Sequence, residues 1–232
     1  MQKLGTRTEL DTVARVRPWT IAASAAIGWS LFTLVILHAV SSFDPVLDAL
    51  SRYAFTDQGS GMLEASLLSF AVGVVAVRGA LLGAGVPFGR TTSVLFACAA
   101  LGLVMAALFP ASFTSDIDPV TGRVHQYASL IAFLSLPAIG LTLLDGLREI
   151  PAPAASRAML IRVLFLCWSS LALFGVSYVA AALPGYPMAA TIAEALPVGF
   201  TQRLTFVADF ALLMVLVVLA ARTARLRQAT QE

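Results

Sequence analysis

Six long apolar runs alternate with short polar connections along the chain. Each is close to the roughly 20 residues that a helix needs to cross the hydrocarbon core of a bilayer. A helix satisfies its own backbone hydrogen bonds in lipid, whereas a membrane β-barrel would show short segments of alternating polarity, which are not seen here. The pattern therefore predicts six spanning helices, over residues 20–40, 61–82, 92–109, 124–144, 159–183 and 204–221.

Composition strengthens this interpretation. Of the 232 residues, 59% are apolar and 12% are charged, against roughly 45–50% and 25% in soluble domains. This excludes a soluble globular fold, and disorder is excluded because disordered chains are poor in apolar residues. We predict an all-α polytopic membrane helix bundle at 20–222, with tails at 1–19 and 223–232. The first run is longer than the apolar region of a signal peptide, so we expect a retained helix.

The basic residues are distributed unevenly between the two sides of the predicted bundle. Twelve of the fifteen Lys and Arg residues fall in the two tails and in the second and fourth connections. The opposite side holds only Arg52, Arg123 and Arg203. Since basic residues favour the cytoplasmic side, both termini are predicted to be cytoplasmic.

Three of the predicted helices begin, on the outer side, with polar residues spaced three and four apart. This spacing places them on one face of a helix. The stripes are Asp57, Ser60, Gly61 and Glu64; Gly122, His125 and Ser129; and Gln202, Thr205 and Asp209. We expect these polar faces to converge at the outer end of the bundle.

Asp209 is the most informative single residue, because it falls well inside the last predicted span. An aspartate near the bilayer centre costs about 2.5–3.5 kcal/mol on insertion scales. It should therefore face the bundle, either protonated or paired. The candidate partners for an ion pair are Arg203, Arg123, His125 and Arg52.

Metal and cofactor chemistry is weakly supported by the sequence. His38 and His125 both fall near outer helix ends, but metal sites need three or four ligands with recognisable spacing. His38, His125, Glu64 and Asp209 are scattered, and no phosphate-binding loop or nucleophile elbow is present. We therefore predict no metal and no cofactor. The basic residues are dispersed, so no nucleic-acid partner is expected.

Several short motifs are spread along the chain, namely Leu50-Ser51-Arg52-Tyr53-Ala54, Phe109-Pro110, Gly122-Arg123, His125, Phe133, Pro137 and Gln202-Arg203. Together they resemble the domain-of-unknown-function 998 family of prokaryotic multi-pass membrane proteins. The resemblance spans about residues 20–222. It implies six helices in a prokaryotic plasma membrane, and it implies no activity.

Three functions are compatible with these residues. In the first, which the sequence favours, an outer pocket binds or transports an anionic lipid-like or small-molecule ligand. The three arginines form a cationic ring there, because guanidinium groups make bidentate contacts with phosphates and carboxylates. The ligand-binding residues would be Arg52, Tyr53, Arg123, His125, Arg203 and Asp209.

In the second, the protein is structural or accessory, and its buried charges are interhelical ion pairs. In the third, it is a membrane-embedded lipid-modifying enzyme with His125 as acid or base, assisted by Asp209 or Glu64. The sequence favours a non-enzymatic role. Membrane lipids and a possible anionic ligand are the expected partners, and protein partners are left open.

Overall fold

The computed structural model describes residues 5–56, 59, 61–113, 118–148 and 154–230. Within these residues the regular structure is entirely helical. The order of elements is α1 (Gly5–Val40), η1 (Leu50–Phe55), α2 (Met62–Gly83), α3 (Arg90–Leu108), α4 (Pro119–Gly146), α5 (Ala154–Ala181), α6 (Pro187–Ala195) and α7 (Val198–Ala229).

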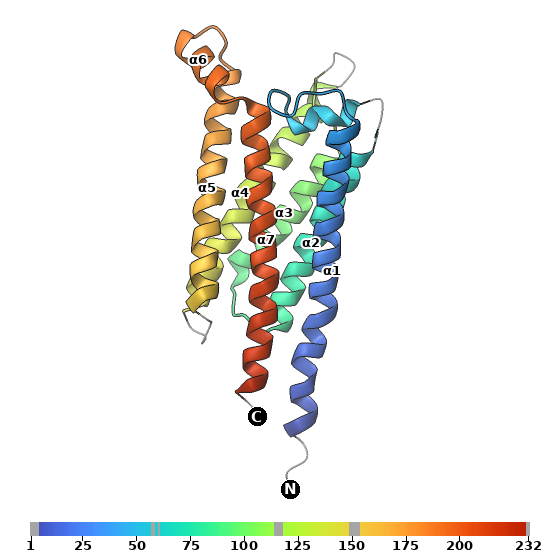
Figure 1. The fold of residues 1–232 in the computed structure, drawn as a ribbon, viewed down its shortest axis with the longest axis vertical. Coiled ribbons are helices and arrows are strands. Elements are labelled where there is room, and N and C mark those ends of the chain that lie inside the picture. The colour runs from blue at the N-terminus through green and yellow to red at the C-terminus, as the bar shows by residue number, and fades with distance from the viewer. Residues whose placement is uncertain (1–4, 57–58, 60, 114–117, 149–153, 231–232) are drawn as a thin grey trace.

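Six of these helices are long and run side by side along the molecule (Figure 1). All six are long and apolar enough to cross a membrane, over Thr12–Val40, Met62–Gly83, Arg90–Leu108, Pro119–Gly146, Ala155–Ala181 and Val198–Ala229. The predicted six-helix membrane bundle is thus confirmed. Both ends of the chain lie at one end of the bundle, and η1 and α6 lie at the other, here called the distal end (Figure 1).

Helices α1, α4 and α7 extend beyond the predicted apolar runs. Helix α1 begins at Gly5 instead of residue 20, and α7 covers Val198–Ala229 instead of 204–221. Hydropathy detects only the stretch that lies in hydrocarbon, whereas backbone hydrogen bonding continues into polar turns at each end. Consequently Arg123 and Arg203 lie within the first turns of α4 and α7.

Helix α7 occupies the centre of the bundle and is the most buried of the six spans. Leu212, Leu213 and Leu216 are fully buried on it. Elsewhere, small residues let backbones approach closely, as is common between membrane helices. A Cβ on Gly102 of α3 would lie 2.6 Å from the carbonyl oxygen of Ala128 on α4.

Helix α5 is at the edge of the bundle, where it packs on α7 and is the least buried span. Its distal half faces α4 across a gap that one hydrogen bond crosses, from Gln126 Nε2 to the Tyr178 hydroxyl (2.9 Å). Helix α6 follows α5 and has no buried residue. Helix α6 has nine residues, which is too short to be detected by a search for apolar runs long enough to span a membrane. The sequence therefore predicted only a connection there.

Candidate functional site

A cleft of about 1130 Å³ lies between α4 and α5 at the distal end. One wall comes from α4, including Arg123, and the other from α5, including Tyr178. Asp48, just before η1, and Arg52, within η1, also line the cleft, as does Gln202 near the start of α7. The segment after α3 contributes Ala111, Ser112 and Phe113. Residues from five parts of the chain therefore build the cleft.

The cleft changes character along its length. Arg52 and Arg123 line it where the helices reach the distal end, whereas Phe133, Leu171 and Phe174 line it further into the bundle. Phe133 lies ten residues beyond Arg123 on α4, about 15 Å along the helix axis. The rings of Phe133 and Phe174 meet edge to face with centroids 5.6 Å apart. The cleft thus has a cationic end and an apolar, aromatic interior.

Among the described residues, each of the two arginines at the cationic end uses only part of its guanidinium group for hydrogen bonding. Arg123 is exposed, and its Nε donates to the Pro119 carbonyl at 3.3 Å. Arg52 contacts Asp48 through Nη1 at 2.6 Å, and half of its side chain is exposed to solvent. A guanidinium carries five N–H donors, so both side chains can still donate hydrogen bonds to an anionic oxygen.

A smaller cavity of about 30 Å³ lies next to the cleft and reaches Asp209. Five residues line both spaces, namely Ser51, His125, Ser129, Phe133 and Gln202. The predicted stripes on α4 and α7 are therefore brought together, since His125, Ser129 and Gln202 meet at the boundary between the cleft and the cavity. Thr205, from the same stripe, is buried and donates to the Thr201 carbonyl at 3.1 Å.

His125 is held in one orientation by the end of α3. Its Nδ1 lies 2.9 Å from the Ala106 carbonyl oxygen and 2.8 Å from that of Phe109. A carbonyl oxygen can only accept, so Nδ1 carries the proton. In the neutral ring, Nε2 then has the available lone pair, on a side chain that lines both spaces.

Asp209 is buried, with 1% of its surface exposed. Neither carboxyl oxygen has a hydrogen-bond partner in the described part of the chain. The predicted ion pair with Arg203, Arg123, His125 or Arg52 is therefore not formed among those residues. Asp209 lies eleven residues into α7, about 16 Å from its start, where no arginine approaches it.

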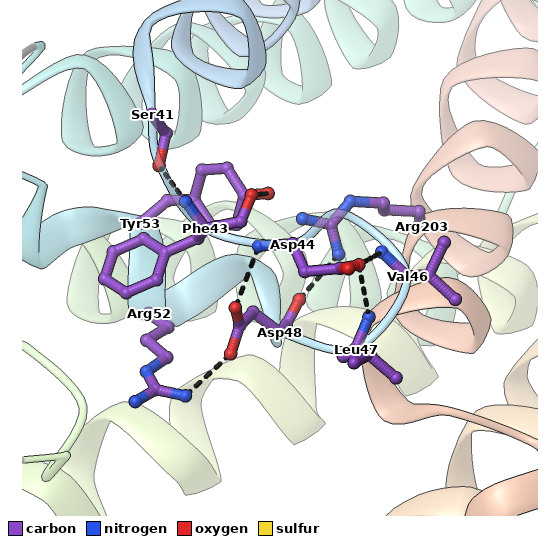
Figure 2. A network of polar contacts seen from close by, with 9 residues as sticks. All are labelled: Ser41, Phe43, Asp44, Val46, Leu47, Asp48, Arg52, Tyr53 and Arg203. Carbon is purple, nitrogen blue, oxygen red and sulfur yellow. Dashed lines mark hydrogen bonds and ion pairs between the residues drawn. The ribbon is translucent and has the colours of Figure 1, made fainter.

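Arg203 is engaged in a separate cluster that also contains His38, Asp48 and Tyr53 (Figure 2 shows all of these except His38). Its Nε donates to His38 Nε2 at 2.8 Å, and its Nη1 donates to the carbonyl oxygens of Asp48 at 2.8 Å and Gly199 at 2.9 Å. His38 can accept because its Nδ1 donates to the Leu34 carbonyl at 2.6 Å. Arg203 lines neither the cleft nor the smaller cavity, so the expected ring of three arginines is not assembled there.

Tyr53 is a packing partner of this cluster. Only 1% of it is exposed, and its hydroxyl donates to the Phe43 carbonyl at 3.0 Å. The Arg203 guanidinium carbon lies 5.0 Å from the centre of the tyrosine ring. Burial raises the pKa of Tyr53, and the charge of Arg203 opposes part of that rise. Tyr53, predicted to bind ligand, lines neither space.

The segment between α1 and η1 is fixed by its own carboxylates (Figure 2). Asp44 Oδ1 accepts from the backbone N–H groups of Val46 at 2.7 Å and Leu47 at 3.0 Å. These two hydrogen bonds hold the pKa of Asp44 below its ordinary value, and the bond from Leu47 has the larger effect. The backbone N–H of Asp44 in turn donates to Asp48 Oδ2 at 2.9 Å. Asp48 is thereby positioned for its contact with Arg52.

Comparison with known proteins agrees with this architecture. Residues 24–219 match the family described as "Protein of unknown function (DUF998)". The chain belongs to the DUF998 family. No curated protein and no solved structure matches it. This DUF998 member is a multi-pass membrane protein, and its chemistry has to be inferred from its own residues.

The remaining candidate residues of this DUF998 protein are spread over the distal end. Glu64 has a buried Oε2 without a hydrogen-bond partner in the described residues, and it lines neither space. His38 lies with Arg203 and His125 with the end of α3, so the two histidines occupy different environments. Across the described residues, no group of three His, Cys, Asp or Glu side chains could hold a metal ion. Asp57 and Ser60 lie outside the described residues.

Several residues of the cleft escaped the sequence analysis. The apolar wall formed by Leu171, Phe174 and Gly175 depends on how α5 is rotated, and a uniformly apolar helix carries no signal for that. Asp48 could have been found, because an acid four residues before Arg52 is a common pairing distance in helical turns.

Proposed function

We propose that this DUF998 protein binds an anionic amphiphile in the cleft between α4 and α5. The head group would contact Arg52 and Arg123, and the apolar tail would lie against Phe133, Leu171 and Phe174. The observation that carries the proposal is the cleft itself. At one end of its apolar interior stand Arg123, which is exposed, and Arg52, which is half-exposed and paired with Asp48. Both arginines have further N–H groups without a partner among the described residues.

The dimensions of the cleft favour an amphiphile over a small anion. From Leu171 to Ala182, both lining residues, α5 rises about 16 Å, close to half of a hydrocarbon core about 30 Å thick. The volume of about 1130 Å³ exceeds the range of roughly 300–1000 Å³ usual for small-molecule pockets. An inorganic anion would leave most of the apolar wall uncovered.

The same proposal includes an orientation. We place both termini in the cytoplasm of a prokaryotic cell and the cleft in the outer leaflet of its plasma membrane. The support is the excess of basic residues on the side of the termini. A cysteine replacing Leu47, which is 65% exposed, should react with a membrane-impermeant maleimide in intact cells. A cysteine replacing Arg225 should react only after lysis, and the reverse pattern would contradict the orientation.

The binding test uses purified full-length protein in a neutral detergent and a fluorescent lysophosphatidylglycerol as the probe. We expect saturable binding that Arg123→Gln or Arg52→Gln weakens about 10-fold or more, because each variant removes a charge-assisted contact worth roughly 1.5–3 kcal/mol. The matched control is Arg90→Gln, which removes an exposed arginine at the start of α3, at the end of the bundle that holds the termini.

Two comparisons identify the ligand class in the same assay. Unlabelled lysophosphatidylglycerol should displace the probe, whereas lysophosphatidylcholine and inorganic phosphate should do so weakly. Equal displacement by lysophosphatidylcholine would show that the arginines do not select charge. Effective displacement by phosphate alone would assign the site to a small anion. Unchanged binding in both arginine variants would refute the proposed site.

A further inference from the structure

We propose that Asp209 is a proton-binding site that exchanges with water through the cleft between α4 and α5. This goes beyond the binding of an amphiphile, because it assigns a second, smaller ligand to the cavity below the cleft. Its proton site, Asp209, is not part of the proposed head-group site.

The first support is the state of the carboxyl group. Both oxygens of Asp209 are buried, and neither has a hydrogen-bond partner in the described residues. An ionised carboxylate without a partner is strongly disfavoured in an apolar interior. Asp209 also lines the small cavity, so the unpartnered group borders a space where a ligand can reach it.

The second support is the lining, which suits a proton better than a metal cation. Apart from Asp209, the oxygen-bearing side chains are those of Ser51, Ser129 and Gln202. Gln202 Oε1 already accepts from the backbone N–H of Leu50 at 2.6 Å. Ions such as Ca²⁺ and Mg²⁺ are held by about six or more oxygens, and the rest of the wall is mainly Leu, Phe and Ala.

The third support is the route. The cavity of about 30 Å³ has room for a water molecule, which needs about 10–15 Å³ of such space. His125 lines both the cavity and the cleft, and its Nδ1 is tied to the carbonyl oxygens of α3. Water can therefore connect the cleft with the cavity at the residues that line both, among them His125, Ser129 and Gln202, and can deliver a proton to an Asp209 oxygen.

The neighbouring elements supply few competing charges. Helix α2 contributes only apolar residues to the cavity, namely Leu63, Leu67 and Phe70, and α3 contributes Leu103 and Ala106. The 3-10 helix η1 contributes Leu50 and Ser51. From α4, the titratable residue is His125. From α5, Cys167 lies beside the same turn of α7 and donates to the Ala208 carbonyl at 3.4 Å. On the α1 side, His38 is bound to Arg203, the nearest cation on α7 itself.

Infrared difference spectroscopy on the full-length protein in liposomes tests the proton site directly. We expect a carbonyl band from a protonated carboxylic acid at neutral pH, which is replaced by carboxylate bands at alkaline pH. Asp209→Asn should abolish this band. Asp209→Glu should shift it, and this second variant serves as the test if Asp209→Asn fails to fold, because it keeps a carboxylic acid. Sodium at constant pH should leave it unchanged. Absence of an Asp209-dependent band, or its titration by sodium, would overturn the proposal.

The route is tested by the rate at which this band shifts on transfer to D₂O. Gly175 lines the cleft, and a Cβ added there meets nothing within 4 Å. Gly175→Trp is therefore designed to place an indole ring in the cleft. We expect exchange to slow several-fold. The matched control, Gly28→Trp, adds the same side chain at an exposed α1 position that is equally open. Equal rates in the two variants would refute the route.

Arg123→Gln should keep the Asp209 band while weakening the binding of the amphiphile. The proton site and the amphiphile site can therefore be refuted separately.

Discussion

At the scale of single residues, the three distal arginines show how surroundings decide the role of one residue type. Arg203 directs its guanidinium to His38, Asp48 and Gly199. Arg123 uses one nitrogen on a nearby carbonyl and is otherwise exposed. Arg203 therefore joins three segments of the chain, whereas Arg123 is available to a ligand.

Arg203→Gln should lower the free energy of unfolding by about 1–3 kcal/mol, because it leaves buried acceptors without their donor. Arg123→Gln, at an exposed position, should change it by less than about 0.5 kcal/mol. Thermal unfolding of the purified protein in detergent measures both. A stable Arg203→Gln variant would show that the cluster is dispensable for folding and would return Arg203 to the candidates for ligand binding.

The sequence identified all three arginines as unusual but could not separate their roles. Each stands at a similar place near a helix start, and the difference arises from His38 and the carbonyl oxygens of the segment before η1. These partners are between 4 and 165 residues away in sequence.

Asp209 was recognised correctly as a residue that faces the bundle, because its burial follows from the cost of placing an acid in lipid.

At the scale of elements, the segment between α1 and η1 is docked on the first turns of α7. The Phe200 backbone N–H donates to the Val46 carbonyl at 2.8 Å, which satisfies a donor that the helix start leaves free. A Cβ on Gly199 would lie 2.5 Å from the Asp48 carbonyl oxygen and 2.7 Å from that of Val46. The close contact depends on the missing side chain, and it positions Asp48 and Arg52 at the cleft.

Gly199→Ala should therefore destabilise the protein by about 1–3 kcal/mol, since two backbone carbonyls would have to move. Gly28→Ala, where an added Cβ meets nothing, is the matched control and should leave stability unchanged or slightly raised. Thermal unfolding compares the two. If they unfold at the same temperature, the segment is not held against α7 as closely as its geometry requires.

At the scale of the whole molecule, the six spanning helices followed from the sequence, whereas η1, α6 and the cleft did not. Six spans are set by the length of apolar runs, which bilayer thickness fixes. The cleft depends on how far α5 stands from α4 and which face it turns inward. Between Leu164 and Leu173, α5 is apolar on all sides except for Ser169 and Ser170. Such a sequence predicts neither the distance of α5 from α4 nor the face that it turns inward.

This arrangement gives the molecule a compact part and an open part. Helices α1, α2, α3, α4 and α7 include closely packed pairs, whereas α5 packs on α7 at the edge of the bundle and is the least buried of the six spans. The resulting opening lies along the distal half of α4 and α5. An amphiphile could enter it from the bilayer without crossing the core of the bundle.

The most direct test of the central claim is photo-cross-linking of a phosphatidylglycerol with a reactive group on its acyl chain, in liposomes containing the full-length protein. Mass spectrometry should locate the adducts on α4 between Gly122 and Phe133 and on α5 between Leu171 and Ala182, and excess unlabelled phosphatidylglycerol should suppress them. Adducts spread evenly over the lipid-facing surfaces of α1 and α5, unaffected by that competitor, would contradict a specific amphiphile site between α4 and α5.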